Sequence, residues 1–530
     1  MGHAFVSRAS QSYSRLVHDV VIVGAGTAGC VLASRLTENP ELSVLLIEAG
    51  ARARRLEARI PAAVSRLYRT EVDWGDSTVP QRELDGREVV FPRGRALGGS
   101  TVMNAMMVLR GHPSDYDEWA ASGCPGWSWS DVRPVFARSA EGPFPLAKLP
   151  SRHVLSDAFV HAAQAAGIPF TADLNAEETV GVGFVPVSQR RGRRFSVVDG
   201  YLRPALRRPN LTVVTGALVS RILVESGRAV GVAYRPHGED RDEEALAGRD
   251  VVLAAGAIGS PHLLQLSGIG PREVLDDAGV ELVHELPGVG ANLLDHLANG
   301  LLVKTQGVET LMSAESRRNL ATWAVRGRGP LTSNLGEAVA FVRTRPDARA
   351  PDLELLFVPV LFEEEGLKQP TEHGFTLAVV LLQPQSAGTV SIRTGDPLAP
   401  AAIDPCYLTD PAGADMRTLL YGLRLARRVV AQQPLAGFVD EELLPGAGAR
   451  TDDELVAHVR ALSQTLYHPA GTCRMGTDAL AVVDPQLRVR GIDRLRVVDA
   501  SVIPRLPSGH TNWPVVMIAE RAAELIAADE

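Results

Sequence analysis

The chain has 530 residues, of which 45% are hydrophobic and 22% are charged, and its formal net charge is −8. This length exceeds what one hydrophobic core supports, and the composition excludes a disordered chain. The negative balance gives no electrostatic drive toward nucleic acid, and no uncharged apolar run reaches the roughly eighteen residues that a membrane-spanning helix requires.

The cysteines and the N-terminal residues indicate where in the cell the protein is located. Four cysteines are scattered along the chain without a CxxC pair, which is typical of a reduced, cytoplasmic protein. Residues 1–17 contain Arg8 and Arg15 but no acid, a composition with a faint likeness to an organellar transit peptide. We interpret this segment as the N-terminal arm of a bacterial protein, and a targeting role stays open. No metal site is predicted.

The first structured segment has the pattern of a strand, a tight turn and a helix. An apolar run at residues 20–23 leads into a turn that contains Gly24, Gly26 and Gly29, and the second apolar strand ends on Glu48. The first glycine allows the tight turn, the second lets the backbone approach a pyrophosphate, and the third lets helix and strand pack closely. The acid can accept hydrogen bonds from a ribose. The segment therefore predicts dinucleotide binding.

Further along the chain, two more segments carry glycine turns. A turn at residues 98–105 has adjacent glycines followed by small hydroxyl residues, which lets the backbone approach a flat or anionic group, with a plain loop as the alternative. A polar helical stretch is expected at 115–139. We interpret the basic cluster at 190–194 as a solvated turn, with contact to an anion as the alternative. Residues 250–257 repeat the pattern of a strand that ends in a glycine turn.

From about residue 301 the pattern changes. Strand-like runs at 357–361, 375–382 and 389–393 follow one another without a regular strand–helix alternation, and helices are expected at 317–328 and 415–432. A series of strands of this kind predicts a separate antiparallel sheet with helices on one face.

Two histidines stand out in the last seventy residues. His468 precedes a proline that holds the chain extended, and His510 lies in an irregular loop before the helix expected at 515–526. Histidine accepts a proton near neutral pH, so two histidines on separate loops could share one hydroxyl group. Taken alone, the local sequence around either histidine favours a structural role.

Four stretches carry a resemblance to a known family. They lie at residues 98–104, 256–270, 467–469 and 497–501. With the glycine turn, they resemble the signatures of the glucose–methanol–choline family of FAD-dependent alcohol oxidoreductases. The resemblance extends over essentially the whole chain, residues 19–527. Within the family, the sequence is most similar to bacterial choline-dehydrogenase-like and aliphatic-alcohol dehydrogenases.

The resemblance implies an α/β fold with two domains. One is a discontinuous, Rossmann-like FAD-binding domain, and the other is an α+β substrate domain built on an antiparallel sheet. The FAD-binding domain is expected to comprise residues 18–165, 209–300 and 456–530. The substrate domain is expected to comprise residues 166–208 and 301–455.

The resemblance also implies the site residues. His468 takes the position of the catalytic base, and His510 binds the substrate hydroxyl and steadies the developing alkoxide. Met103 stands where some members attach FAD through a histidine, so non-covalent FAD is expected. The residues expected to bind FAD are Gly24, Gly26, Thr27, Ala28, Gly29, Glu48, Ala49, Trp74, Gly98, Ser100, Asn104, Ala105, Val219, Ala255, Asp499, Ala500, Thr511 and Asn512.

The implied reaction is oxidation of a primary alcohol to the aldehyde, with proton removal by His468 as hydride passes to flavin N5. Oxygen or a quinone-like carrier is expected to accept the electrons. A homo-oligomer and peripheral membrane contact stay open.

Three alternative functions remain at this point. Choline-type oxidation is one, although the apolar residues 357–362 favour an aliphatic or aryl alcohol. A light-driven fatty-acid decarboxylase is the second, but Gly336 and Leu356 stand near the positions of that group's functional cysteine and arginine. The third is a catalytically idle flavin-binding protein, against which the presence of both histidines weighs.

Overall fold

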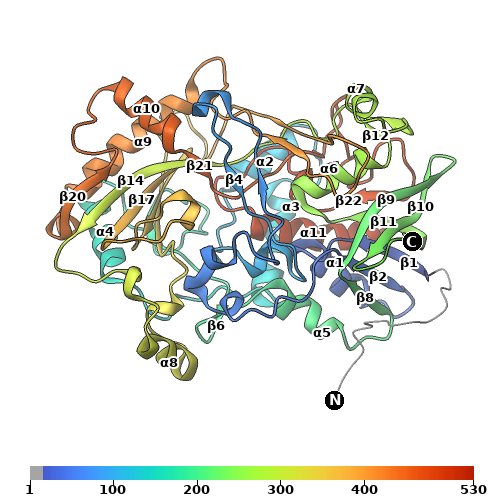
Figure 1. Ribbon diagram of the computed structural model, residues 1–530, viewed down its shortest axis with the longest axis horizontal. Helices are drawn as coiled ribbons and strands as arrows, with labels where there is room; N and C mark the ends of the chain where they lie inside the picture. The colour runs from blue at the N-terminus through green and yellow to red at the C-terminus, as the bar shows by residue number, and fades with distance from the viewer. Residues whose placement is uncertain (1–15, 530) are drawn as a thin grey trace.

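The computed structural model describes residues 16–529. It has two lobes, each built on a seven-stranded sheet (Figure 1). The lobe on the right of the view holds a mixed sheet, and the lobe on the left holds an antiparallel sheet. The expected combination of a Rossmann-like unit with an antiparallel-sheet unit is confirmed.

The mixed sheet has a parallel core. Its strand order is β8 (Leu211–Thr215), β2 (Val44–Glu48), β1 (Leu16–Val23), β11 (Glu243–Leu253), β10 (Arg228–Pro236) and β9 (Ala217–Glu225). A further strand, β22 (Leu495–Val497), lies parallel to the end of β11, whereas β10 and β9 are antiparallel. The core strands are buried on both faces, which explains their continuous apolar runs.

Several helices belong to the lobe of the mixed sheet. They include α1 (Thr27–Leu36), α3 (Trp129–Glu141), α6 (Gly256–Leu266) and α11 (Asn512–Ala528). The C-terminal helix α11 packs on both α1 and α3. Arg35 of α1 forms a 2.8 Å ion pair with Glu520 of α11, which links the first helix of the chain to the last.

The second sheet is antiparallel throughout. Its order is β20 (Val439–Leu444), β14 (Leu297–Thr305), β17 (Gly374–Leu381), β16 (Leu353–Val358), β15 (Ala338–Val342) and β5 (Gly181–Phe184), with β21 (Gln464–Thr465) also on β14. Helices α4 (Val154–Ala165) and α9 (Ala414–Val430) cover one face, and α10 (Asp452–Leu462) packs on α9.

Strand periodicity divides the second sheet into two faces. In β16, Leu353, Leu355 and Phe357 point into the core beneath α4 and α9. The intervening Leu356 and Val358 face the opposite side, where they line a cavity. One face of this sheet is therefore a packed core and the other forms a wall of the site.

The remaining elements are short. They include β3 (Asp76–Ser77), β4 (Val90–Phe91), α2 (Pro113–Ala121), β6 (Gln189–Arg190), β7 (Arg193–Arg194), α5 (Arg203–Ala205), β12 (Ile269–Gly270), α7 (Arg272–Asp277), β13 (His284–Glu285), α8 (Arg317–Arg326), β18 (Thr389–Ser391) and β19 (Ala402–Asp404). Among residues 16–529, no helix has the length and apolar character needed to cross a membrane.

Two expected elements differ from those observed. The helical stretch at 115–139 is two helices, α2 and α3, because Gly123 and Gly126 adopt positive φ between them. The strand expected at 357–361 is β16, which begins at Leu353; the acid Glu354 breaks the apolar run and hides the start of the strand.

The five domain segments remain a prediction, and packing differs from them at three places. Helix α4 falls in the first expected FAD-binding segment, but it packs on the second sheet. Strand β21 falls in the last FAD-binding segment and pairs with β14, which itself begins before residue 301. These elements carry the apolar pattern of any buried helix or strand, so their lobe cannot be assigned from the pattern alone.

Candidate active site

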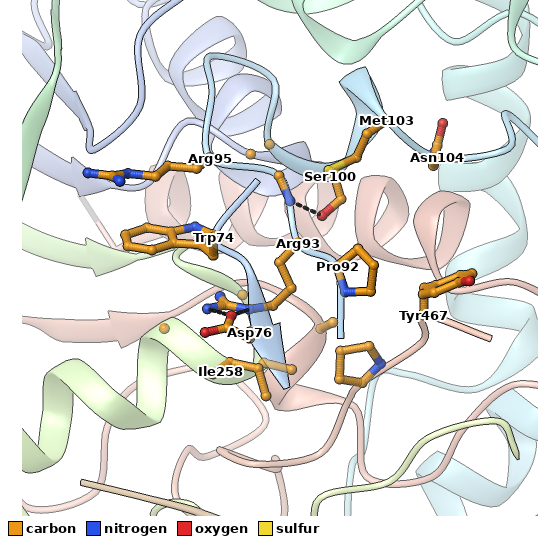
Figure 2. Close-up of a pocket in the computed structure, with 18 of the residues that line it drawn as sticks. Trp74, Asp76, Pro92, Arg93, Arg95, Ser100, Met103, Asn104, Ile258 and Tyr467 are labelled. Atoms are coloured by element: carbon orange, nitrogen blue, oxygen red, sulfur yellow. Dashed lines mark hydrogen bonds and ion pairs between the residues drawn. The ribbon is translucent and has the colours of Figure 1, made fainter. Parts of the chain in front are cut away.

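A cavity of about 570 Å³ lies between the two lobes. Its wall runs from the carboxyl ends of β1, β2 and β11 to the open face of β14, β16 and β17. Figure 2 shows part of this wall, where Trp74 lies beneath Arg95 and the adjacent Arg93 contacts Asp76. The centres of the two guanidinium groups lie 5.5 and 5.0 Å from the Trp74 ring.

The glycine turn forms one end of the cavity. Gly24 has φ +97°, and a Cβ there would lie 2.5 Å from the Ala254 carbonyl oxygen. A Cβ at Gly29 would lie 1.9 Å from the Gly24 carbonyl oxygen, whereas one at Gly26 would meet nothing closer than 3.9 Å. Gly24 and Gly29 thus permit close packing of strand and helix, and Gly26 leaves space beside a cavity wall.

Three helix N-termini open at this cavity. The N-cap residues of α1, α6 and α11 are Gly26, Ala255 and Thr511, and all three line the wall. Within residues 16–529, none of these N-cap side chains bonds to its own helix. At α6 the first N–H is already used, because Gly256 donates to Asp499 Oδ2 at 2.9 Å. The uncapped starts of α1 and α11, with the positive ends of the helices, make the cavity suitable for an anion such as a pyrophosphate.

Glu48 is fixed on the wall beside the glycine turn. Its carboxylate accepts hydrogen bonds from the backbone N–H groups of Ala25 and Gly50, each at 2.8 Å. Burial raises the pKa of Glu48 to about 7, against the lowering effect of those two bonds. Each oxygen keeps a further lone pair, so the group suits a ribose diol.

Two histidines meet at the other end of the cavity. The ring centres of His468 and His510 lie 4.6 Å apart with their planes at 72°. The pKa of His468 is held well below its ordinary value, first by burial and then by the charges of His510 and His296. His468 is therefore neutral near neutral pH and can accept a proton.

Each of these histidines has a buried partner behind the wall. The Nδ1 atoms of His468 and His296 lie 2.9 Å apart, and Nε2 of His510 lies 3.3 Å from Oε1 of Glu354. Glu354 is fully buried, and its Oε2 has no hydrogen-bond partner among the described residues. The backbone N–H of His468 donates to Asp295 at 2.9 Å.

The wall near the histidines is largely apolar. It includes Val64, Met107, Leu335, Leu356, Val358 and Phe362. Asn104 lies at the edge of this region and is held from behind by Arg194, whose NH1 donates to the Asn104 side-chain oxygen at 2.8 Å. Burial lowers the pKa of Arg194 to about 9. The basic cluster interpreted as a solvated turn thus contains one buried arginine.

Most of the residues expected from the sequence lie on this one cavity. Both histidines line it, and so do all of the expected FAD-binding residues except Gly29 and Gly98. Gly29 serves the packing of α1, and Gly98 donates its N–H to the Ala25 carbonyl at 2.8 Å. Sequence reasoning missed a set of buried residues that contact the site from behind: Arg194, Asp295, His296 and Glu354.

A glycine turn suited to a dinucleotide and a pair of histidines suited to proton transfer thus share one cavity, a combination typical of a dinucleotide-dependent oxidoreductase. The chain belongs to the GMC oxidoreductase family, whose N-terminal model matches residues 18–298 and whose C-terminal model matches residues 384–519. It is an FAD-dependent oxidoreductase that acts on CH–OH donors, so the family and enzyme class expected from the sequence are confirmed.

Similar proteins cover the whole fold. An uncharacterized GMC-type oxidoreductase of Mycobacterium tuberculosis is 45% identical over 525 residues, covering 96% of this chain and 99% of its own. Alcohol dehydrogenase [acceptor] of Pseudomonas putida is 37% identical, with 96% of each chain covered. The crystal structure of pyridoxine 4-oxidase from Mesorbium loti superposes with a TM-score of 0.87 at 33% identity, covering 96% of this chain and 98% of that one.

Proposed function

We propose that the protein oxidises a primary alcohol to the aldehyde, with His468 as the base and His510 as the group that binds the hydroxyl oxygen. The observation that carries this proposal is the His468–His510 pair, 4.6 Å apart between ring centres, on the same cavity as the glycine turn. FAD, when bound, supplies the acceptor for the hydride that leaves the carbinol carbon.

The residues at the glycine end fit FAD. The uncapped start of α1 suits the pyrophosphate, and Glu48 suits the ribose. The flavin end is assigned to the region of Asn104, Asp499 and the start of α11, all on the cavity wall. Met103 also lines this wall and offers a thioether in place of a histidine, so FAD is held without a covalent bond. Acid precipitation of the protein should leave the flavin in the supernatant.

The two histidines have complementary tasks. His468 is neutral because burial lowers its pKa, so it can take the hydroxyl proton. His510 contacts Glu354 through Nε2, and its other ring nitrogen is left to contact the alcohol oxygen. Removal of the hydroxyl proton makes the carbinol C–H a better hydride donor, and a donor aimed at the oxygen stabilises the negative charge that develops there.

The apolar wall favours an aliphatic or aryl alcohol over choline. A quaternary ammonium is best held by aromatic faces or a free carboxylate. The wall carries the aromatic rings of Tyr68, Phe362 and Tyr467, so the preference against choline rests on the carboxylates. Among the described residues of the cavity wall, the acids are Glu48, Asp76 and Asp499, which come from the FAD-binding lobe. On β16, Glu354 is engaged by His510, and its neighbours Leu356 and Val358 are apolar.

The light-driven decarboxylase is disfavoured at the same wall. Gly336 and Leu356 both line the cavity and supply neither a thiol nor a guanidinium group. A Cβ at Gly336 would lie 2.7 Å from Leu356 Cδ1, so this part of the wall is already closely packed.

Anaerobic stopped-flow mixing tests the proposal. FAD-loaded protein is mixed with a panel of aliphatic and aryl alcohols and with choline, and bleaching of the flavin is followed. We expect apolar alcohols to reduce the flavin fastest and His468→Ala to slow reduction by about 10²-fold or more. His161→Ala is the control, because His161 is exposed on α4 away from the cavity. An unchanged rate in His468→Ala would contradict the assignment of the base.

A further inference from the structure

We propose that His296 is a positioning residue that fixes the tautomer of His468, so that Nε2 of His468 carries no proton and can accept the one from the alcohol. This inference deepens the proposed function and rests on it, because the tautomer affects the rate only if His468 is the base. It is carried by the contacts of three ring nitrogens and one carbonyl oxygen.

His296 uses both of its ring nitrogens. The residue lies directly before β14, and its side chain is fully buried. Its Nε2 is 3.1 Å from the carbonyl oxygen of Leu382, and its Nδ1 is 2.9 Å from Nδ1 of His468. The two rings meet with their planes at 82°. His296 therefore connects a fixed backbone acceptor to the catalytic ring.

The protons in this chain of contacts can be assigned in sequence. A carbonyl oxygen only accepts, so Nε2 of His296 carries a hydrogen. Burial lowers the pKa of His296 to about 3, so the ring is neutral and its Nδ1 holds a lone pair. His468 must then donate from its own Nδ1. Because His468 is also neutral, its remaining nitrogen, Nε2, has the lone pair on a side chain that lines the cavity.

A purely structural histidine would explain the bond to Leu382 but not the second contact. The residue before it, Asp295, also holds His468, by accepting its backbone N–H at 2.9 Å. The other carboxylate oxygen of Asp295 accepts from the hydroxyl of Tyr407, which anchors the pair from behind. Two adjacent residues thus fix the main chain and the ring of His468.

Loss of the acceptor at 296 has a chemical consequence. Without it, the His468 ring can turn or place its hydrogen on Nε2, and that form cannot take a proton from the alcohol. In the serine-protease triad, removal of the group that holds the catalytic tautomer lowers kcat by about 10⁴-fold. We expect a smaller loss here, because Asp295 still holds the backbone of His468.

Two variants of nearly equal size separate the acceptor from the packing. In His296→Asn, the amide oxygen takes about the place of Nδ1 and can still accept from His468. In His296→Leu, no acceptor remains. We expect the flavin-reduction rate at saturating alcohol to fall about 10- to 10²-fold in His296→Leu and by less than about threefold in His296→Asn, with KM little changed.

A second measurement reads the tautomer without turnover. Protein labelled with ¹⁵N-histidine is studied by long-range ¹H–¹⁵N NMR, and the His468 signals are identified by their loss in His468→Ala. We expect a lone-pair type Nε2 in the wild type and in His296→Asn, and a mixed signal in His296→Leu.

The outcomes distinguish this inference from the function on which it rests. If His468→Ala abolishes reduction while His296→Leu keeps both the wild-type rate and a lone-pair Nε2, the role of His296 is overturned and the base assignment stands. If His468→Ala reduces at the wild-type rate, the proposed function falls and this inference with it. A protonated Nε2 in the wild type overturns the tautomer assignment directly.

Discussion

The two ends of the cavity are built in different ways. The glycine end comes from one short segment, and its working groups are backbone N–H groups together with Glu48. The histidine end is assembled from four separate segments, which supply His296, Glu354, His468 and His510. The first end depends on local backbone shape, and the second depends on how distant side chains meet.

This difference determines what a substitution does at each end. At the glycine end, an added methyl group either collides with backbone that cannot move or enters space meant for a ligand. At the histidine end, a substitution changes hydrogen bonds and charge while the backbone stays in place. Substitutions at the glycine end should therefore change folding or FAD affinity, and those at the histidine end should change the rate of flavin reduction.

The largest effect is expected for Gly29→Ala. The new Cβ would lie 1.9 Å from the Gly24 carbonyl oxygen, so the strand–turn–helix unit cannot keep its packing. We expect a loss of about 3 kcal/mol in the free energy of unfolding, or failure to accumulate folded protein. Chemical denaturation of the FAD-free protein measures it.

Gly26→Ala is the matched variant at the same turn. Its Cβ would meet no protein atom nearer than Gly99 Cα at 3.9 Å, so the free energy of unfolding without FAD should stay within about 0.5 kcal/mol of wild type. The methyl group would stand where a pyrophosphate approaches, and we expect the Kd for FAD to rise about 10-fold or more. If both variants lost the same stability, Gly29 would not be the packing position and Gly26 the ligand-facing one.

At the histidine end, the effect expected for Glu354→Gln is smaller than that expected for Gly29→Ala. The amide still accepts from Nε2 of His510 but lacks the negative charge of the carboxylate beside that ring. We expect flavin reduction to slow about 10- to 10²-fold, because the donor aimed at the alcohol oxygen is weakened. Anaerobic stopped-flow reduction of FAD-loaded protein measures the change.

Glu337→Gln is the control for that substitution. Glu337 is another buried glutamate, but it accepts from Ser156 and Ser333 at 2.8 and 2.6 Å and does not line the cavity. Its loss of charge should lower stability without slowing flavin reduction. If both variants slow reduction equally, Glu354 acts through the fold and not through His510.

The same difference explains what could be predicted from the sequence. The turn at Gly24 and the acid Glu48 can be recognised in the sequence because one continuous segment specifies strand, turn and helix. The contact of His296 with His468 spans 172 residues, and that of Glu354 with His510 spans 156, so no local pattern encodes either. Glu354 left one trace, as a single acid inside the apolar run of β16.

Arg194 shows the same limit in another way. Its neighbours Arg190 and Arg191 are exposed, which agrees with a solvated turn, yet Arg194 is buried and bonded to Asn104. Charge composition predicts the average environment of a cluster and cannot identify the one member that turns inward. The antiparallel sheet was predicted from its strands, whereas the lobe to which α4 belongs follows only from tertiary packing.

The smallest effect is expected from pH: the rate of flavin reduction should hardly change between pH 7.5 and 6. An imidazole with the ordinary pKa of about 6.5 is roughly three-quarters protonated at pH 6, so a base of that kind would lose about fourfold between pH 7.5 and 6. The pKa of His468 lies well below 6.5 because of burial, so its neutral form persists. We expect the flavin-reduction rate to fall less than about 1.5-fold.

Stability, unlike the rate, should fall as the pH is lowered over the same window. The folded state disfavours the proton that an unfolded histidine binds, so the contribution of His468 to the free energy of unfolding is present above pH 6.5 and is lost as pH falls below it. The enzyme is therefore kept at pH 7.5 and jumped to the lower pH on mixing. Glu48, with a pKa of about 7, changes its protonation in this range, so excess FAD is added to keep the site loaded. The series stops at pH 6 because burial raises the pKa of Asp295, which holds the backbone of His468, to about 6. A fourfold fall centred at pH 6.5 would show that His468 is not the base that limits flavin reduction.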